Sequence, residues 1–197
     1  MSERIRRAEV RFIQGMAVLE DLRLVERWKK VGTPFIVGAM GYGLPVAPDI
    51  DMEIFCRRPS VEAGFRVLSE CVTHPRVRKA RFANELDGPD QGLYFQLRYL
   101  DGLGEEWKLD MWLVANDHPG PLSRDLLTPM RRALTEESRD AILEIKEAIL
   151  ARGLKYRSID VYRAVLEGGV RGLEAFQAWH ERVKPSGLTD WRPKLPR

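Results

Sequence analysis

The sequence has little of what metal–thiol sites and disulfide frameworks require. Only two of its 197 residues are cysteines, Cys56 and Cys71, and they form no Cys-x-x-Cys pair. The three histidines, His74, His118 and His180, stand at spacings that fit no metal-binding motif. These absences argue against a zinc site or a disulfide and predict two free, buried thiols.

Long apolar runs, strong net charge and a Walker loop are also absent. No apolar run is long enough to span a bilayer, and the charged residues 2–7 precede no signal-peptide core, so we expect a cytoplasmic protein. The glycines between 38 and 43 lack the Gly-Lys-Ser/Thr ending of a P-loop ATPase. A net charge of +3 and an isoelectric point near 8.9 are too mildly basic to indicate polynucleotide binding without a clustered patch.

What the chain does have is enough apolar content, 44% with five tryptophans, for one domain, or for one domain plus a small helical appendage. Its most informative stretch is residues 34–55, in which an apolar strand leads into a glycine-rich loop and then into residues 49–55. Strict alternation there predicts a strand with Asp49, Asp51 and Glu53 on one face. Two like charges this close are costly unless a cation lies between them, and Mg²⁺ prefers carboxylate oxygens. The stretch therefore predicts a metal-phosphate site.

This arrangement resembles the nucleotidyltransferase superfamily of polymerase-beta-like enzymes. The family signature is an apolar residue, Gly and Gly or Ser, then about ten residues, then Asp-apolar-Asp-apolar. Here Val37-Gly38-Ala39 is followed by Asp49, eleven residues after Gly38, and by Asp51. The chain departs from the family at Ala39, where a Ser hydroxyl often assists phosphate binding. The resemblance covers residues 30–115.

The family's third carboxylate is expected on a later strand, and Asp110 in Trp107-Lys-Leu-Asp-Met fills that place. The resemblance implies Mg²⁺ or Mn²⁺ held by Asp49, Asp51 and Asp110, which would also be the catalytic residues, with Asp110 a candidate proton acceptor. It implies a nucleotide, ATP among the candidates, bound by the loop. The residues expected to bind it are Gly38, Ala39, Gly41 and Tyr42. Alternatives remain open: the acidic residues lie on an exposed edge strand, Asp110 pairs with Lys108 or Arg98, and Tyr42 only packs the loop.

The expected fold class is α+β, a mixed nucleotidyltransferase-type sheet with flanking helices and then a carboxy-terminal helical region. Periodicity predicts a helix over residues 8–31, although residues 9–13 could equally form a strand. A helix capped by Ser60 is expected up to residue 74. The expected strands cover residues 34–37, 49–55, 76–83, 93–100 and 106–114, the last two joined by a glycine-containing hairpin loop.

From Pro119 the composition changes, and the prolines and glycines up to Pro129 predict a linker. Helices are then expected after Thr135, from Ser158 and after Gly169. The predicted organisation is a nucleotidyltransferase core over residues 1–118, a helical region over 119–183 and an extended tail over 184–197.

The function implied by the resemblance is transfer of a nucleoside monophosphate from a triphosphate to a hydroxyl, with release of pyrophosphate. We expect a small-molecule or protein acceptor rather than nucleic acid, because the later helices carry no aromatic-basic pattern. One alternative is a non-catalytic nucleotide-binding relative. Another is a basic nucleic-acid-binding module. Its footprint would be Arg4, Arg6, Arg7, Arg11, Lys184, Arg192, Lys194 and Arg197.

Overall fold

The computed structural model describes residues 1–184 and 191–194. The chain divides into two compact units, which we describe separately. The sheet unit comprises residues 13–40 and 48–120, and the helical unit comprises residues 1–12, 41–47 and 121–197. Helix α1, Glu3–Asp21, contributes its first part to the helical unit and its second part to the sheet unit.

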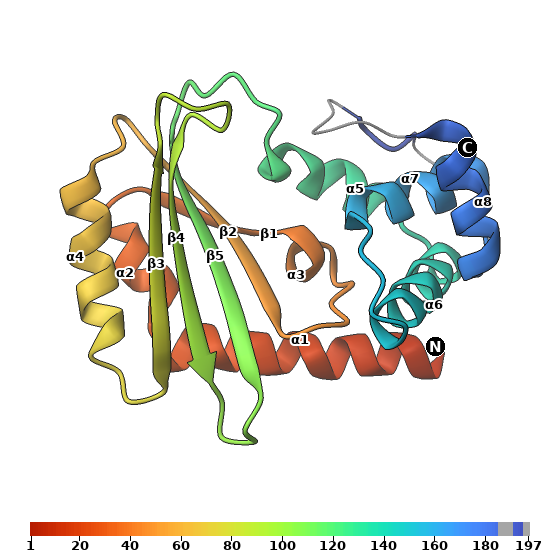
Figure 1. Cartoon of the computed structure of the whole chain (residues 1–197), viewed down its shortest axis with the longest axis horizontal. Helices are drawn as coiled ribbons and strands as arrows, with labels where there is room; N and C mark the ends of the chain where they lie inside the picture. The colour runs from red at the N-terminus through yellow and green to blue at the C-terminus, as the bar shows by residue number, and fades with distance from the viewer. Residues whose placement is uncertain (185–190, 195–197) are drawn as a thin grey trace. The chain divides into compact units, whose positions relative to one another are not determined.

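The sheet unit is built on five strands in the order β1-β2-β5-β4-β3 (Figure 1). Strands β2 and β5 are parallel, and the other neighbours are antiparallel. The strands are β1 Thr33–Val37, β2 Asp49–Cys56, β3 Val77–Glu85, β4 Gly92–Leu100 and β5 Glu106–Ala115. The mixed sheet with flanking helices confirms the expected fold class.

One face of this sheet is apolar because every second residue of the central strands is hydrophobic. Ile50, Met52 and Leu109 are at most 1% exposed and join one core with residues of helices α2, Leu24–Lys29, and α4, Val61–Val72. Helix α4 begins as predicted, with the Ser60 hydroxyl accepting a hydrogen bond from the backbone N–H of Ala63. The opposite face of β2 and β5 therefore carries their polar side chains.

Two expectations for the sheet unit were wrong. The helix expected over residues 8–31 is two helices, because Arg23 adopts a left-handed backbone with φ of 47° between them, and residues 9–13 are helical. The glycine-rich loop begins with a short helix, α3, Gly38–Tyr42. Met40 of this helix is 1% exposed, so core packing outweighs the low helix propensity of glycine.

The helical unit has a core of its own, formed by helices that follow residue 120. Helix α6 is capped by Thr135 as predicted, and its Ile142 and Ile145 are fully buried. The linker predicted up to Pro129 is wrong in its second half, because Pro129 lies in the first turn of α5, where a missing N–H costs no hydrogen bond. The elements are η1 Ser123–Leu126, α5 Leu127–Ala133, α6 Glu136–Ala151, α7 Ser158–Gly168 and α8 Leu173–Val183. Most of the predicted tail, residues 185–190 and 195–197, lies outside the described residues.

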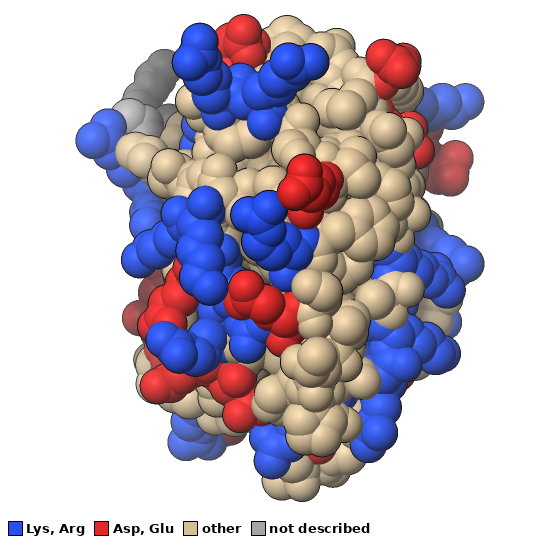
Figure 2. Space-filling view, turned by 90° about the vertical axis from the view of Figure 1, so that its left-hand side faces the viewer, with Lys and Arg blue, Asp and Glu red and all other residues tan. Residues whose placement is uncertain are grey.

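The edge of the sheet at β3 carries charged side chains. This edge strand exposes Arg78, Lys79 and Arg81, which discourages pairing with another strand. Figure 2, which faces the side of α4, shows basic and acidic side chains interspersed over much of that side.

The two cysteines are free and buried, as predicted. Within residues 1–184 and 191–194, no helix is both long and apolar enough to cross a membrane.

Candidate metal and nucleotide site

The three predicted aspartates meet on the polar face of the sheet unit. The parallel register of β2 and β5 places Asp51 opposite Asp110, and Asp49 opposite Lys108. One carboxylate oxygen from each of Asp49, Asp51 and Asp110 lies within 4.8 Å of the other two, and all three residues are half-buried. The sequence prediction that these residues come together is confirmed. Hard oxygen donors at this separation fit Mg²⁺ or Mn²⁺.

Asp110 is held in place by neutral donors from the adjacent strand β4. The Tyr94 hydroxyl donates to Asp110 Oδ1 at 2.7 Å, and Gln96 Nε2 donates to the same oxygen at 2.9 Å. Gln96 Nε2 also lies 2.7 Å from the Tyr94 oxygen. Burial, and then the hydrogen bond to Asp110, raise the pKa of Tyr94 to about 12, so its hydroxyl remains a donor. These contacts fix the orientation of the carboxylate.

Lys108 supplies the positive charge closest to the aspartates. Its Nζ lies 2.8 Å from Asp110 Oδ2 and 3.2 Å from Asp49 Oδ1. Burial alone would lower the pKa of Lys108, but the hydrogen bond to Asp110 and the charge of Asp49 outweigh it and raise this pKa. Burial would likewise raise the pKa of Asp110, but the donors Lys108, Tyr94 and Gln96 lower it. Lys108 stays protonated and Asp110 stays ionised at neutral pH.

Asp51 packs against the start of α3, where the absence of a side chain is essential. A Cβ on Gly38 would lie 2.2 Å from Asp51 Oδ2, and Gly38 has a φ of +60° that favours glycine. The predicted phosphate-binding residue Ala39 follows within α3 and is half-buried. Gly38 and Ala39 thus lie beside the carboxylates in the sheet unit.

The other two predicted nucleotide-binding residues, Gly41 and Tyr42, belong to the helical unit. Tyr42 is 5% exposed and packs edge-on against Tyr162, with ring centroids 5.6 Å apart. Its ring is therefore a core residue there, which agrees with the packing alternative.

Cationic side chains hold the backbone of residues 41–44 within the helical unit. Arg131 donates to the Gly41 carbonyl at 3.1 Å. Arg139 donates to the Gly43 carbonyl at 2.9 Å, and Lys146 donates to the Leu44 carbonyl at 2.8 Å. We call Arg131, Arg139 and Lys146 the carbonyl clamp. It satisfies consecutive backbone acceptors with charged donors.

The sequence prediction named Lys108 but missed Tyr94 and Gln96. The β4–β5 hairpin could have indicated them. In this antiparallel pair Leu100 lies opposite Glu106, and moving one residue back along β4 corresponds to moving one residue forward along β5. This register places Gln96 opposite Asp110. Alternation then places Tyr94 on the same face.

Two further basic side chains, Arg98 and Arg157, form ion pairs of their own. Arg98 lies 3.6 Å from Glu106, and Arg157 lies 2.9 Å from Asp160. Lys108, by contrast, contacts two of the three aspartates, Asp49 and Asp110.

The chain shares the fold of solved nucleotidyltransferase structures, which confirms the resemblance seen in the sequence at the level of the fold. Among solved structures it is similar to Cid1 poly(U) polymerase bound to MgATP, with a TM-score of 0.62 and 15% identity, over 84% of this chain and 50% of that chain. It is also similar to a cytoplasmic RNA terminal U-transferase, with a TM-score of 0.57 and 16% identity, over 79% of this chain and 47% of that one.

A third similar structure is Cid1 in complex with the UTP analogue UMPNPP, with a TM-score of 0.55 and 14% identity over 84% of this chain. The chain spans about half the length of these proteins. No protein-family model matches the sequence, and no curated protein matches it.

Proposed function

We propose that this protein is a metal-dependent nucleotidyltransferase that transfers a nucleoside monophosphate from a triphosphate to a hydroxyl and releases pyrophosphate. The observation that carries the proposal is the convergence of Asp49, Asp51 and Asp110 within 4.8 Å on paired strands of this fold. Solved neighbours with the same fold are named as nucleotidyl-transferring polymerases and hold magnesium nucleotides. The neighbours support the class of reaction, and the carboxylates support its chemistry.

Each aspartate has a distinct task in this proposal. Asp49 and Asp51 would hold the metal on β2, and Asp110 would complete the site from β5. When bound, the metal lowers the pKa of the attacking hydroxyl and neutralises phosphate charge. The lowered pKa of Asp110 makes it a weak proton acceptor, so we assign it to holding the metal. Tyr94 and Gln96 orient Asp110 through their hydrogen bonds.

The choice of nucleotide and acceptor follows from the neighbours, not from this chain's own side chains. The structures of Cid1 include complexes with MgATP, MgGTP and a UTP analogue. Because those structures are described as revealing UTP selectivity, we place UTP first among the donors, and ATP and GTP after it. The expected small-molecule or protein acceptor is now less favoured than RNA, because the neighbours are named as RNA terminal uridylyl transferases. The 3′-hydroxyl of an RNA oligonucleotide is the first acceptor to test.

The direct test follows transfer of label from each α-³²P-labelled triphosphate to an RNA oligonucleotide in Mg²⁺ or Mn²⁺, alongside calorimetric binding of the same triphosphates. Asp110→Asn should lower turnover by at least about a thousandfold, because it removes one metal ligand. Asp117→Asn, at an exposed residue of the same unit, is the matched control and should act as wild type. Metal-dependent binding without transfer to any acceptor would favour the non-catalytic alternative. Folded protein that binds none of the four triphosphates would contradict the proposal.

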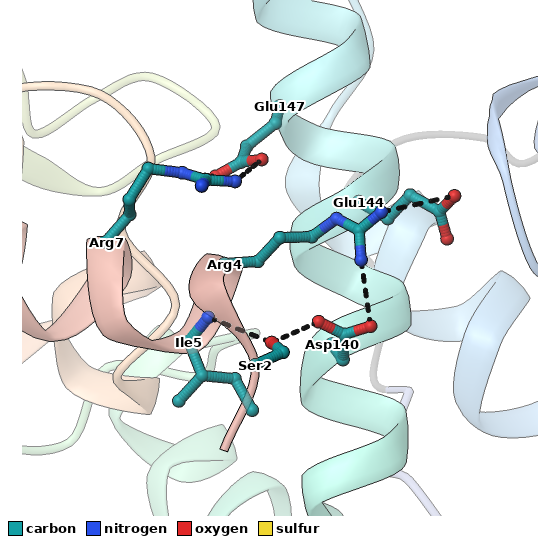
Figure 3. A network of polar contacts seen from close by, with 7 residues as sticks. All are labelled: Ser2, Arg4, Ile5, Arg7, Asp140, Glu144 and Glu147. Atoms are coloured by element: carbon teal, nitrogen blue, oxygen red, sulfur yellow. Dashed lines mark hydrogen bonds and ion pairs between the residues drawn. The ribbon is translucent and has the colours of Figure 1, made fainter.

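The nucleic-acid-binding alternative is weakened by the ion pairs of its basic residues. Arg4 lies 3.1 Å from Asp140 and 3.7 Å from Glu144, and Arg7 lies 2.7 Å from Glu147 (Figure 3). Acidic residues of α6 thus pair with two of the four amino-terminal arginines of the expected footprint. A simple cationic surface would bind RNA with a steep dependence on salt. We expect the isolated protein to show only a shallow one.

A further inference from the structure

The Lys108 ammonium group contacts carboxylate oxygens that a divalent cation would also need. It lies between two of the three metal-ligand candidates, at 2.8 Å from Asp110 Oδ2 and 3.2 Å from Asp49 Oδ1. The side chain is about 30% exposed and stands on a flexible four-carbon stem. The two carboxylates therefore attract the ammonium group, and the flexible, partly exposed side chain can also move away from them.

The two oxygens of Asp110 are engaged by different kinds of donor. Oδ1 accepts from Tyr94 and Gln96, which are neutral and anchored on β4. Oδ2 accepts from the charged Lys108 ammonium group at 2.8 Å. Moving Lys108 would free Oδ2 without disturbing the orientation of the carboxylate. Asp110 Oδ2 can therefore exchange the ammonium group for another cation while Oδ1 keeps its hydrogen bonds.

A metal ion and an ammonium group that share the same oxygens repel each other strongly at this distance. Entry of a metal would therefore displace the Lys108 head group from Asp110 Oδ2 and Asp49 Oδ1. The displaced ammonium remains tethered beside the metal, within reach of the phosphate oxygens of a bound triphosphate. Lysine binds phosphate as a mobile point charge, which suits this movement.

We propose that Lys108 is a displaceable internal counter-ion, which stabilises the aspartates without metal, opposes metal binding alone and pairs with the triphosphate once metal and nucleotide are both bound. This inference rests on the proposed function. It makes metal and nucleotide binding cooperative, because the nucleotide gives the displaced ammonium a new partner and each ligand strengthens the other.

The test measures Mn²⁺ binding by calorimetry without nucleotide for wild type, Lys108→Gln and Lys108→Arg. Lys108→Gln should bind Mn²⁺ about tenfold more tightly, since the competing charge is gone, whereas Lys108→Arg should bind no more tightly than wild type. Lys29→Gln, at an exposed lysine of the same unit, should match wild type. With a non-hydrolysable triphosphate present, Mn²⁺ affinity should rise in wild type and rise several-fold less in Lys108→Gln.

Stability supplies an independent readout. Without metal, Lys108→Gln should melt at a lower temperature than wild type, and saturating Mn²⁺ should restore most of that loss. Should the variant fail to fold, the wild-type Lys108 ammonium resonance in ¹⁵N NMR serves instead, and it should shift when Mg²⁺ is added. An unchanged resonance would overturn the inference.

The outcomes separate this inference from the proposed function. Equal Mn²⁺ affinity in wild type and Lys108→Gln, or weaker affinity in the variant, would make Lys108 a structural ion-pair partner and leave the metal site standing. Folded wild type and folded Lys108→Gln that both bind no Mn²⁺, with or without triphosphate, would overturn the proposed function together with the inference.

Discussion

The two units use positive charge in opposite ways. In the sheet unit one ammonium group, Lys108, contacts two carboxylates of a cluster of three. In the helical unit the carbonyl clamp directs three cations at neutral backbone oxygens. The first arrangement gathers carboxylate oxygens that a metal ion could use, whereas the second fixes a backbone segment. Charge marks a ligand site where carboxylates gather around one place and a structural contact where cations satisfy fixed dipoles.

The largest effect is expected from Gly38→Ala, which alters the carboxylate cluster of the sheet unit. The added Cβ would collide with Asp51 Oδ2 and would occupy a backbone with φ of +60°. We expect a loss of about 2–4 kcal/mol in the free energy of unfolding and loss of Mn²⁺ binding. Urea denaturation and calorimetry measure the two effects.

The matched control is Gly153→Ala in the helical unit. Gly153 has a φ of +62°, but nothing lies within 4 Å of its added Cβ. It should cost only about 1 kcal/mol of backbone strain and leave Mn²⁺ binding intact. Equal losses in the two variants would mean that Asp51 is not held against Gly38.

A smaller effect is expected when the carbonyl clamp is broken by Lys146→Met. Lys146 is 7% exposed, and its removal leaves the buried Leu44 carbonyl without this donor. We expect a loss of about 2 kcal/mol in the free energy of unfolding, the usual cost of an unsatisfied buried acceptor. Differential scanning calorimetry should show a lower melting temperature.

Lys155→Met, at an exposed lysine of the same unit, should change stability by no more than about 0.5 kcal/mol. An unchanged melting temperature in Lys146→Met would show that the clamp contributes nothing to stability, and the contrast between the units would fail.

The smallest effect is expected at Asp21, a carboxylate of the sheet unit that is already well paired. The hydrogen bond from Tyr99, followed by the charges of His74 and Arg76, lowers the pKa of Asp21 below its ordinary value of 3.8. Stability from a lowered carboxyl pKa is present above the unfolded value and is lost as the pH falls through the folded value. Asp21→Asn should therefore cost about 1 kcal/mol at pH 7, since the group is partly exposed.

Urea denaturation at pH 7, 5 and 3 checks the sign of this effect. The difference between wild type and Asp21→Asn should be smaller at pH 3 than at pH 5, because the carboxylate is protonated over that range. A difference that grows from pH 5 to pH 3 would contradict the pairing of Asp21.

Much of the fold and of the carboxylate site could be predicted because the signals are local. Alternation gave the strand faces, and Ser60 and Thr135 marked two helix starts through their hydroxyls. The hydrogen bonds to Asp110 depend on the strand register across the β4–β5 hairpin, which is not a local signal. Short-range breaker rules failed where packing decides, at Gly38–Tyr42 and around Pro129. The carbonyl clamp joins residues 90 or more positions apart, and no local pattern encodes it.

The discontinuous make-up of the helical unit has a consequence for synthesis on the ribosome. Leu44 and its clamp partner Lys146 are 102 positions apart. At roughly 5–20 residues per second, the nascent segment 41–47 waits about 5–20 seconds for its last partner. A chain released before Lys146 would contain all three aspartates and the whole sheet, yet its residues 41–44 would lack part of their support. During translation the three aspartates are therefore synthesised before the carbonyl clamp is complete.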